Sequence, residues 1–302
     1  MRLSGLYILS FLPSLLAIHS GASVAYTQFP FFATLILQNT GATSTWLCGG
    51  SLLNSSVVVT AAHCTRSAAV AHIYLNASVM LSPYSPGPSI SSTQIYTNPS
   101  YSTTNFYHDI GFVVIPSPST ITPLKIGTSS LISNLKACQL LSVVGRGYSC
   151  NGGCLPNNLQ YAELPLVPIS SCVGPDYSSQ WTSAIVGSDL CLGYEGVCKN
   201  ATLASEETCS GDSGGPLFDG NQVQYGVVSR GSSKGCGLGT NPSIFSSFGD
   251  PINYAFVTSF VAATNYSGFA TAQSTQSSAG GRWHCFFLVL LPFLVAITSE
   301  KM

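Results

Sequence analysis

The chain has 302 residues, a formal net charge of −1 and only 7% charged residues, whereas soluble domains usually carry about 25%. So few charges exclude an extended basic surface of the kind that binds nucleic acid. The length is sufficient for one large domain, or two of ordinary size, with a substantial hydrophobic core.

Residues 1–17 are typical of a secretory signal peptide. A basic residue follows the initial methionine, and the apolar run Leu6–Leu16 is too short to span a bilayer. We expect cleavage after Ala17, with cleavage as late as Ala22 as the alternative. A signal peptide directs the chain to an oxidising compartment, which agrees with the 11 cysteines. We therefore expect a secreted, extracellular protein. Sequons for N-glycosylation lie at Asn54, Asn76, Asn200 and Asn265.

From residue 29 onward, short apolar runs alternate with stretches of Gly, Pro, Asn and Ser. The runs are rich in β-branched and aromatic residues, which is typical of an all-β sandwich or barrel. They comprise residues 31–37, 51–53, 57–60, 73–75, 110–115, 140–144, 164–167, 223–229 and 244–245. The stiff polar segment 116–123 between them is a candidate boundary between two β units.

The pattern changes at Asp250. Apolar residues then recur at helical spacing, with Asp250 as the cap and a proline at the first helical position, which predicts a helix over 251–264. Residues 265–281 are rich in Ser, Thr and Gln and are expected to form a flexible stalk. Residues 282–302 contain a second apolar run, which indicates either a lipid-anchor signal or a short membrane anchor. Either anchor would tether the domain to the outside of the cell.

Ser213 lies in the segment Cys209–Pro216, between glycines and directly after an aspartate. Glycine permits backbone conformations that are closed to other residues and allows a substrate to approach closely. Main-chain N–H groups in such a turn can converge on an oxyanion that forms during acyl transfer. An ordinary turn is the alternative for this segment taken alone.

A serine nucleophile needs a base, and the base needs an acid that holds its tautomer. His63 follows an apolar run and precedes a cysteine, and a buried structural histidine is its alternative interpretation. Asp109 is the only Asp or Glu before Glu163, and it enters an apolar run. Burial of a lone carboxylate is costly unless another group pairs with it. A solvated loop acid is the alternative for Asp109.

With these motifs in this order, the chain resembles the chymotrypsin/trypsin family of serine endopeptidases over about residues 18–264. The residues that carry the resemblance are Cys48–Leu52, Thr60–Cys64, Asp109–Ile110 and Gly211–Pro216. The resemblance implies an all-β fold of two six-stranded antiparallel barrels, about 29–116 and 130–248, with the active site between them, and a C-terminal helix.

The resemblance also implies a role for each site residue. His63 would accept the proton of Ser213 and pass it to the leaving amine, and Asp109 would orient His63. The N–H groups of Gly211 and Ser213 would form the oxyanion hole. Ser229 would support Asp109, and the segment that begins at Ser229 would pair with the substrate backbone.

The family places a substrate pocket next to the serine. Glu207 falls at the pocket floor, where trypsin-like members carry aspartate, and Gly231 and Ser243 fall on its walls. An acid at the floor predicts cleavage after Arg or Lys. Arg230 and Arg146 replace tryptophans that are usual in the family, so we expect altered neighbouring subsites.

The resemblance pairs six cysteines as Cys48–Cys64, Cys172–Cys191 and Cys209–Cys236. Four more have three possible pairings: Cys138, Cys150, Cys154 and Cys198. Metal binding by the Cys150–Cys154 segment is an alternative. We expect no metal and no other cofactor.

Activation is the main departure from the family pattern. Family members are usually cut after Arg or Lys, and the new amino group pairs with the aspartate before the serine. No Lys or Arg occurs between Arg2 and Arg66. The family spacing instead points to Ile18, so we expect signal peptidase cleavage after Ala17 to produce the amine that pairs with Asp212.

The sequence thus predicts a monomeric serine endopeptidase that acts on protein or peptide substrates. The alternative is a catalytically impaired, protease-like binding protein or inhibitor.

Overall fold

The computed structural model describes residues 18–76, 89–149, 154–172, 189–193, 206–231 and 242–262, together with Cys198 and Cys236. The predicted signal peptide, stalk and apolar tail lie outside the described residues, as do the sequons at Asn200 and Asn265.

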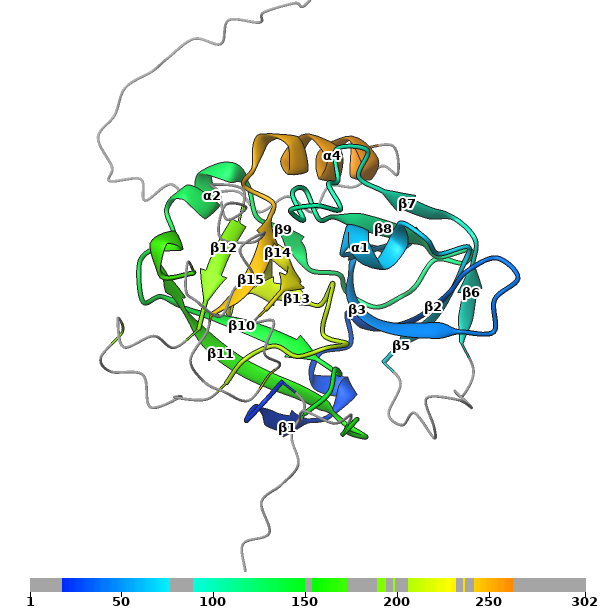
Figure 1. Cartoon of the computed structure of the whole chain (residues 1–302), viewed down its shortest axis with the longest axis horizontal. Helices are drawn as coiled ribbons and strands as arrows, with labels where there is room; N and C mark the ends of the chain where they lie inside the picture. The colour runs from blue at the N-terminus through cyan, green and yellow to red at the C-terminus, as the bar shows by residue number, and fades with distance from the viewer. Residues whose placement is uncertain are drawn as a thin grey trace, which may run out of the picture. The chain divides into compact units, whose positions relative to one another are not determined.

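The first half of the chain forms a seven-stranded antiparallel sheet in the order β6-β5-β2-β3-β4-β8-β7 (blue and cyan in Figure 1). Its strands are β2 (Phe32–Gln38), β3 (Thr45–Asn54), β4 (Val57–Thr60), β5 (Val70–Leu75), β6 (Ile90–Ser92), β7 (Ile95–Thr97) and β8 (Gly111–Val114). The two end strands, β6 and β7, are separated in the chain only by residues 93–94. The sheet must therefore curl until its two ends lie close together.

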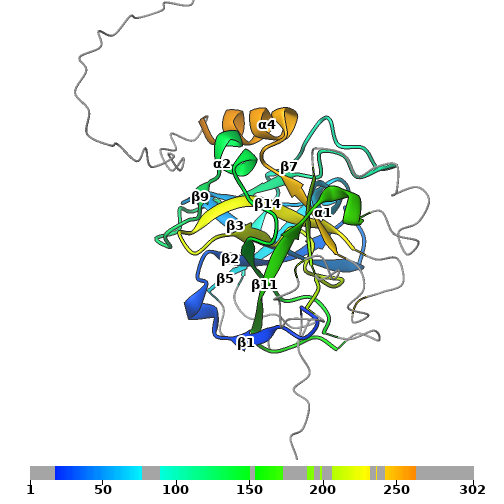
Figure 2. The same ribbon diagram turned by 90° about the vertical axis from the view of Figure 1, so that its left-hand side faces the viewer.

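The second half contains a closed barrel. Strands β10 to β15 form a ring because β11 pairs with β12 as well as with β10. The strands of this sheet are β9 (Lys125–Ile126), β10 (Leu140–Gly145), β11 (Leu159–Val167), β12 (Asp189–Leu192), β13 (Pro216–Phe218), β14 (Val223–Arg230) and β15 (Ser243–Ser247). β1 (Ala22–Val24) joins the outer edge of β11, so the described N-terminal segment belongs to this half (Figure 2).

Buried apolar residues explain why these runs form barrels. All eight residues of β14 are buried, as are all four residues of β4. Strands buried on both faces read as continuous apolar runs, and the interior of a small barrel is filled by such side chains. The predicted all-β fold is confirmed, with one closed barrel and one curled sheet.

The helical elements are short except for the last. They are η1 (Tyr26–Gln28), α1 (Ala62–Thr65), α2 (Ser129–Ser133), η2 (Ile169–Cys172) and α4 (Pro251–Ala262). Asp250 caps α4, because its Oδ1 accepts hydrogen bonds from the N–H groups of Ile252 and Asn253 at 3.0 and 2.9 Å. In the described part of the chain, no helix has both the length and the apolar character that a membrane-spanning helix needs.

The C-terminal helix packs on the first sheet although it follows the second barrel. The rings of Phe256 and Phe260 in α4 lie 5.0 and 4.4 Å from the ring of Phe112 in β8. β8 begins two residues after Asp109, and this contact holds the start of β8 in place. Figure 1 shows α4 above both halves of the chain.

Candidate active site

His63 lies in the single turn of α1, directly after the buried strand β4. The disulfide Cys48–Cys64 ties this turn to β3. The turn therefore has little freedom to move, and the imidazole of His63 is presented at the edge of the first sheet with about a quarter of its side chain exposed (23%).

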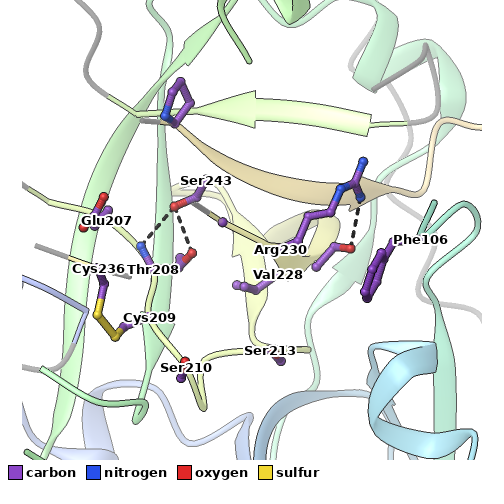
Figure 3. A pocket seen from close by; sticks show the side chains of 13 residues that line it. Phe106, Glu207, Thr208, Cys209, Ser210, Ser213, Val228, Arg230, Cys236 and Ser243 are labelled. Carbon is purple, nitrogen blue, oxygen red and sulfur yellow. Dashed lines mark hydrogen bonds between the residues drawn. A yellow bond between two sulfur atoms is a disulfide. The ribbon is translucent and has the colours of Figure 1, made fainter. Parts of the chain in front are cut away.

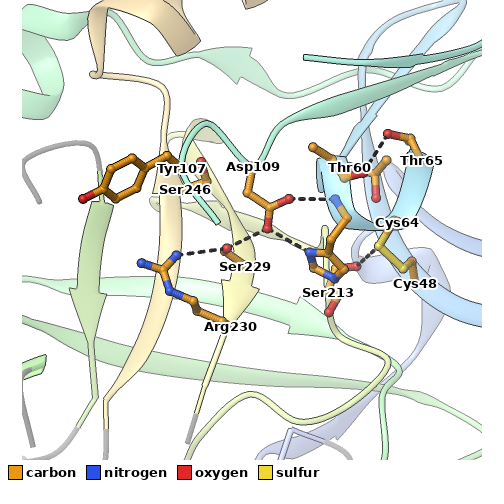
Figure 4. A network of polar contacts seen from close by, with 12 residues as sticks. Cys48, Thr60, Cys64, Thr65, Tyr107, Asp109, Ser213, Ser229, Arg230 and Ser246 are labelled. Atoms are coloured by element: carbon orange, nitrogen blue, oxygen red, sulfur yellow. Dashed lines mark hydrogen bonds and ion pairs between the residues drawn. A yellow bond between two sulfur atoms is a disulfide. The ribbon is translucent and has the colours of Figure 1, made fainter. Parts of the chain in front are cut away.

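Asp109 lies two residues before β8 and is fully buried. Its Oδ2 lies 2.8 Å from Nδ1 of His63 and accepts a hydrogen bond from the Ser229 hydroxyl at 2.6 Å. Its Oδ1 accepts a hydrogen bond from the main-chain N–H of His63 at 2.8 Å (Figure 4). A carboxylate only accepts, so Nδ1 of His63 carries the proton and Nε2 is left with a lone pair.

Ser213 comes from the second half of the chain, and its carbonyl oxygen lies 3.8 Å from Sγ of Cys64, the residue after His63 (Figure 4). The same carbonyl oxygen accepts a hydrogen bond of 2.7 Å from the N–H of Gly49 in β3. This hydrogen bond joins the two halves of the chain at Ser213, close to the disulfide that holds the turn of His63.

The segment before Ser213 forms a tight turn. The N–H of Asp212 donates to the carbonyl of Cys209 at 3.0 Å, and Gly211 has φ +97°. A positive φ at the third position is the mark of a type II turn, which favours glycine there. The N–H groups of Gly211 and Ser213 donate to no acceptor among the described residues. Two main-chain donors this close in the chain can bind one oxyanion.

Asp212 is fully buried beneath this turn. It accepts hydrogen bonds from the N–H groups of Gly147 and Cys209 at 2.6 and 2.9 Å. Burial raises the pKa of Asp212 to about 7, although these hydrogen bonds oppose the rise. Ile18 is also fully buried, and the next residue, His19, donates its main-chain N–H to the carbonyl of Glu207 at 2.9 Å.

A pocket of about 230 Å³ opens next to Ser213 (Figure 3). Its lining includes the residues that the resemblance assigned to it: Glu207, Ser229, Gly231 and Ser243. Glu207 is 5% exposed. The hydroxyl of Thr208 donates to Oγ of Ser243 at 2.8 Å, which fixes one wall.

Phe106 also lines the pocket, although no motif predicted it. Its ring meets the ring of His63 edge to face at a centroid distance of 6.0 Å. Phe106 has φ +60°, which is rare for an aromatic residue. It therefore covers one side of the imidazole.

Arg230 forms an ion pair that the sequence did not predict. Its Nη2 lies 2.6 Å from Oδ2 of Asp189, and its Nη1 donates to the Ser229 hydroxyl at 3.3 Å. In Figure 3 Arg230 and Glu207 lie on opposite sides of the pocket. The guanidinium therefore points away from Glu207.

Four disulfides are described. Three are the pairs that the resemblance implied, and the fourth joins two of the four cysteines that were left open. They are Cys48–Cys64, Cys172–Cys191, Cys209–Cys236 and Cys138–Cys198. Cys154 is also disulfide-bonded, while Cys150 lies outside the described residues.

Among the described residues, Cys48, His63 and Cys64 place potential metal-ligand atoms within 4.8 Å of one another. The two sulfurs form a disulfide and cannot act as thiolate ligands. This group is accounted for without a metal ion.

Two sequons lie in the described residues, in different environments. Asn76 is exposed. Asn54 is only 7% exposed, and its Oδ1 accepts a hydrogen bond from the N–H of Ser56. A glycan on Asn54 would require this side chain to leave its buried position, so Asn76 is the more accessible of the two.

Comparisons with known proteins agree with this geometry. The sequence model of the family named Trypsin matches residues 18–253. Trypsin delta of Drosophila melanogaster is 31% identical over 230 residues, which cover 74% of this chain and 81% of that protein. Chymotrypsin-like elastase family member 1 of Bos taurus is 28% identical over 235 residues, with coverage of 74% and 83%.

A solved structure also matches. The structure titled HL collagenase superposes with a TM-score of 0.65 over 82% of this chain and 99% of its own chain, at 24% sequence identity. At this identity the match bears on the fold alone. The curated relatives include proteins named as trypsins and one named as an elastase. Similarity to them therefore does not determine the substrate preference, which depends on the pocket.

Proposed function

Because the chain belongs to the trypsin family of serine endopeptidases, we propose that Ser213 is its nucleophile, His63 its general base and Asp109 the residue that orients His63. The observation that carries this proposal is the buried carboxylate of Asp109, 2.8 Å from Nδ1 of His63. This contact leaves Nε2 able to accept the proton of Ser213.

The reaction proceeds in two halves. Oγ of Ser213 attacks the substrate carbonyl while its proton moves to Nε2 of His63, and Asp109 stabilises the imidazolium that forms. The N–H groups of Gly211 and Ser213 bind the oxyanion of the tetrahedral intermediate. This intermediate collapses to an acyl-enzyme as His63 gives its proton to the leaving amine. Water then attacks the ester, with His63 as the base, and releases the acid and free Ser213.

Labelling with an organophosphonate tests this proposal. Such a reagent phosphonylates an activated serine, so we expect stoichiometric labelling of the secreted protein and loss of peptidase activity in step with labelling. Ser213→Ala should abolish both, whereas Ser130→Ala on the exposed face of α2 should change neither. Absence of labelling in the folded wild-type protein would overturn the proposal and favour a protease-like binding protein.

We propose further that the enzyme cleaves after Arg or Lys. Glu207 is buried in the lining of the pocket, and a desolvated carboxylate pairs best with a cation. The guanidinium of Arg230 forms its ion pair with Asp189, so Arg230 does not fill the pocket floor. Ser243 and Gly231 are small and leave room for a long side chain.

Peptides that differ only in the residue before the scissile bond test this preference. We expect kcat/KM to be highest for Arg and Lys, and Glu207→Gln to lower it by about 10- to 100-fold for these substrates, since a charge-assisted hydrogen bond is lost. Glu163→Gln on the exposed face of β11 is the matched control and should have no effect. Faster cleavage after Leu or Phe than after Arg would refute the preference.

The proposed secretion and surface tether rest on residues 1–17 and 265–302, which lie outside the described residues. Disulfide bonds support an extracellular location. Release of the protein from intact cells by a phosphatidylinositol-specific phospholipase would support the lipid anchor. Retention after this treatment would favour the membrane anchor.

A further inference from the structure

A buried ion pair lies behind the proposed triad. Arg230 ends β14 and Asp189 begins β12, and β15 runs between these two strands. The side chain of Arg230 reaches past β15 to Asp189, and the two side chains are only 2% and 1% exposed. This pair is one of three ion pairs among the described residues, and the other two both involve histidine.

The burial of this pair calls for an explanation. Removing two charges from water costs several kcal/mol per ion, and their attraction often fails to offset that cost. Burial raises the pKa of Asp189 to about 6, with Asp109 and Asp250 adding to the rise and Arg230 opposing it. A buried ion pair is therefore weak evidence for a purely stabilising role.

The contacts of Arg230 lead to the triad. Its Nη1 donates to Oγ of Ser229 at 3.3 Å, and Ser229 donates to Oδ2 of Asp109 at 2.6 Å (Figure 4). A hydroxyl has a single proton, and its direction is free unless its partners fix it. A guanidinium can only donate, so the proton of Ser229 cannot point at Arg230. It must point at Asp109.

Asp189 completes this arrangement. Its carboxylate fixes the position of the guanidinium at 2.6 Å and balances its charge. A lone cation close to Asp109 would reduce the stabilisation that Asp109 gives to the imidazolium of His63. The pair thus supplies a fixed hydrogen-bond donor to Ser229 without adding net charge.

We propose that Arg230 and Asp189 are a pair of positioning residues for the proposed triad: Asp189 holds Arg230 against Ser229, which fixes the Ser229 hydroxyl as a donor to Asp109 and so orients His63. This inference rests on the proposed peptidase function. It assigns to Arg230 a task other than contact with substrate, although Arg230 borders the pocket.

Four variants test the inference: Arg230→Met, Arg230→Lys, Asp189→Asn and the double variant Arg230→Met/Asp189→Leu. Lys136→Met, in an exposed position after α2, is the matched control. Active sites are titrated with an organophosphonate, so that kcat refers to folded enzyme only. The measurements are kcat, KM and the acid limb of kcat/KM against pH, together with the thermal midpoint.

Loss of the donor to Ser229 should lower kcat of Arg230→Met by about tenfold, with KM within about twofold of wild type, because small misplacements at a triad are costly. Arg230→Lys should recover part of kcat, since an ammonium can also donate to Ser229 and pair with Asp189. The acid limb should move to higher pH in Arg230→Met and to lower pH in Asp189→Asn, because the two changes leave opposite charges near His63.

The double variant separates positioning from charge balance. It has no net charge at the site and no donor to Ser229, so the acid limb should return to that of the wild type while kcat stays low. Recovery of kcat in the double variant would overturn the inference, as would a kcat of Arg230→Met within twofold of wild type. A higher KM with unchanged kcat would also overturn it and assign Arg230 to substrate binding.

The outcomes distinguish this inference from the function on which it rests. If the wild-type enzyme is labelled and hydrolyses peptides while all four variants keep its kcat, only the positioning role fails. If the folded wild-type protein is neither labelled nor active, the proposed function itself fails. If Arg230→Met does not fold, Arg230→Lys and Asp189→Asn still provide the comparison.

Discussion

Both oxygens of Asp109 are occupied, and this fixes the carboxylate in one orientation. Oδ1 accepts the main-chain N–H of His63, while Oδ2 faces Nδ1 of His63 and the hydroxyl of Ser229. Every partner on either oxygen is a donor. The site therefore fits a carboxylate, whose two oxygens only accept hydrogen bonds, and does not fit an amide, which carries N–H donors.

Asp109→Asn removes this match, because the amide nitrogen would face a donor in either orientation. His63 would then adopt the other tautomer, with the proton on Nε2, and could not accept the proton of Ser213. We expect kcat to fall by about 10⁴-fold, measured with active-site-titrated enzyme near pH 7. Asp219→Asn, in the turn between β13 and β14, should leave kcat unchanged. A loss of less than tenfold would contradict this role of Asp109.

The motifs around His63 and Asp109 predicted that these two side chains meet, but not everything that surrounds them. His63, Asp109 and Ser213 each stand in a local pattern with few alternatives. Asp189 lies in no such pattern, and it is 41 residues from Arg230. Their contact depends on the register of β12, β15 and β14, which no local segment of sequence determines.

At the scale of elements, the long apolar runs were predicted and the short strands were not. The run 140–144 is β10 (Leu140–Gly145), and the run 223–229 is β14 (Val223–Arg230). β9 and β1 have two and three residues, and they are extended only because β14 and β11 pair with them. Such strands are set by tertiary pairing, which outweighs the weak local preference of so short a segment.

The seam between the two halves depends on close approach of the backbone. Gly214 has φ +82°, and a Cβ there would clash with the Oγ1 of Thr60 and lie 2.5 Å from the carbonyl oxygen of Gly49. The N–H of Gly214 also donates to the carbonyl of Val228 at 2.7 Å. The glycine thus brings β3 and β14 together beside Ser213.

Gly214→Ala should destabilise the fold by about 3 kcal/mol, the sum of a left-handed backbone strain and an overpacking cost. Activity per folded molecule should fall as well, since Ser213 is the preceding residue. Urea unfolding with the disulfides intact measures the first effect. Gly220→Ala is the control, because a Cβ there meets no atom within 4 Å. Equal stability of the two variants would contradict this prediction, because it would show that a Cβ at position 214 does not disturb the contact between the two halves.

At the scale of the whole molecule, the N-terminal segment is coupled to the turn that carries Ser213. Ile18 and Asp212 are both fully buried in the second half, and His19 bonds to the backbone of Glu207 at the pocket. Among the described residues Asp212 takes part in no ion pair, and burial raises its pKa to about 7. We propose that an amino group on Ile18 pairs with Asp212, because a cation beside this buried carboxylate would stabilise its charged form.

The pH dependence of stability tests this coupling. In a form that retains residues before Ile18, the raised pKa of Asp212 contributes stability below about pH 4 that is lost as the pH rises to about 7. A shift from 3.8 to about 7 sets the loss at up to about 4 kcal/mol. In a form that begins at Ile18, the ammonium lowers the pKa of Asp212, so this decline should be absent. Stability should instead fall above about pH 8, where an amino group loses its proton.

Urea unfolding of both forms between pH 4 and 9 measures the difference, and amino-terminal sequencing of the secreted protein shows which form is produced. Asp212→Asn in the longer form is the control. It cannot ionise, so it should remove the decline between pH 4 and 7 while it costs a constant amount of stability. Identical pH profiles for the two forms, or a secreted protein that begins at Gly21 or later, would exclude the Ile18 amine as the partner of Asp212. Residual peptidase activity in such a protein would then require an oxyanion hole that forms without that ion pair.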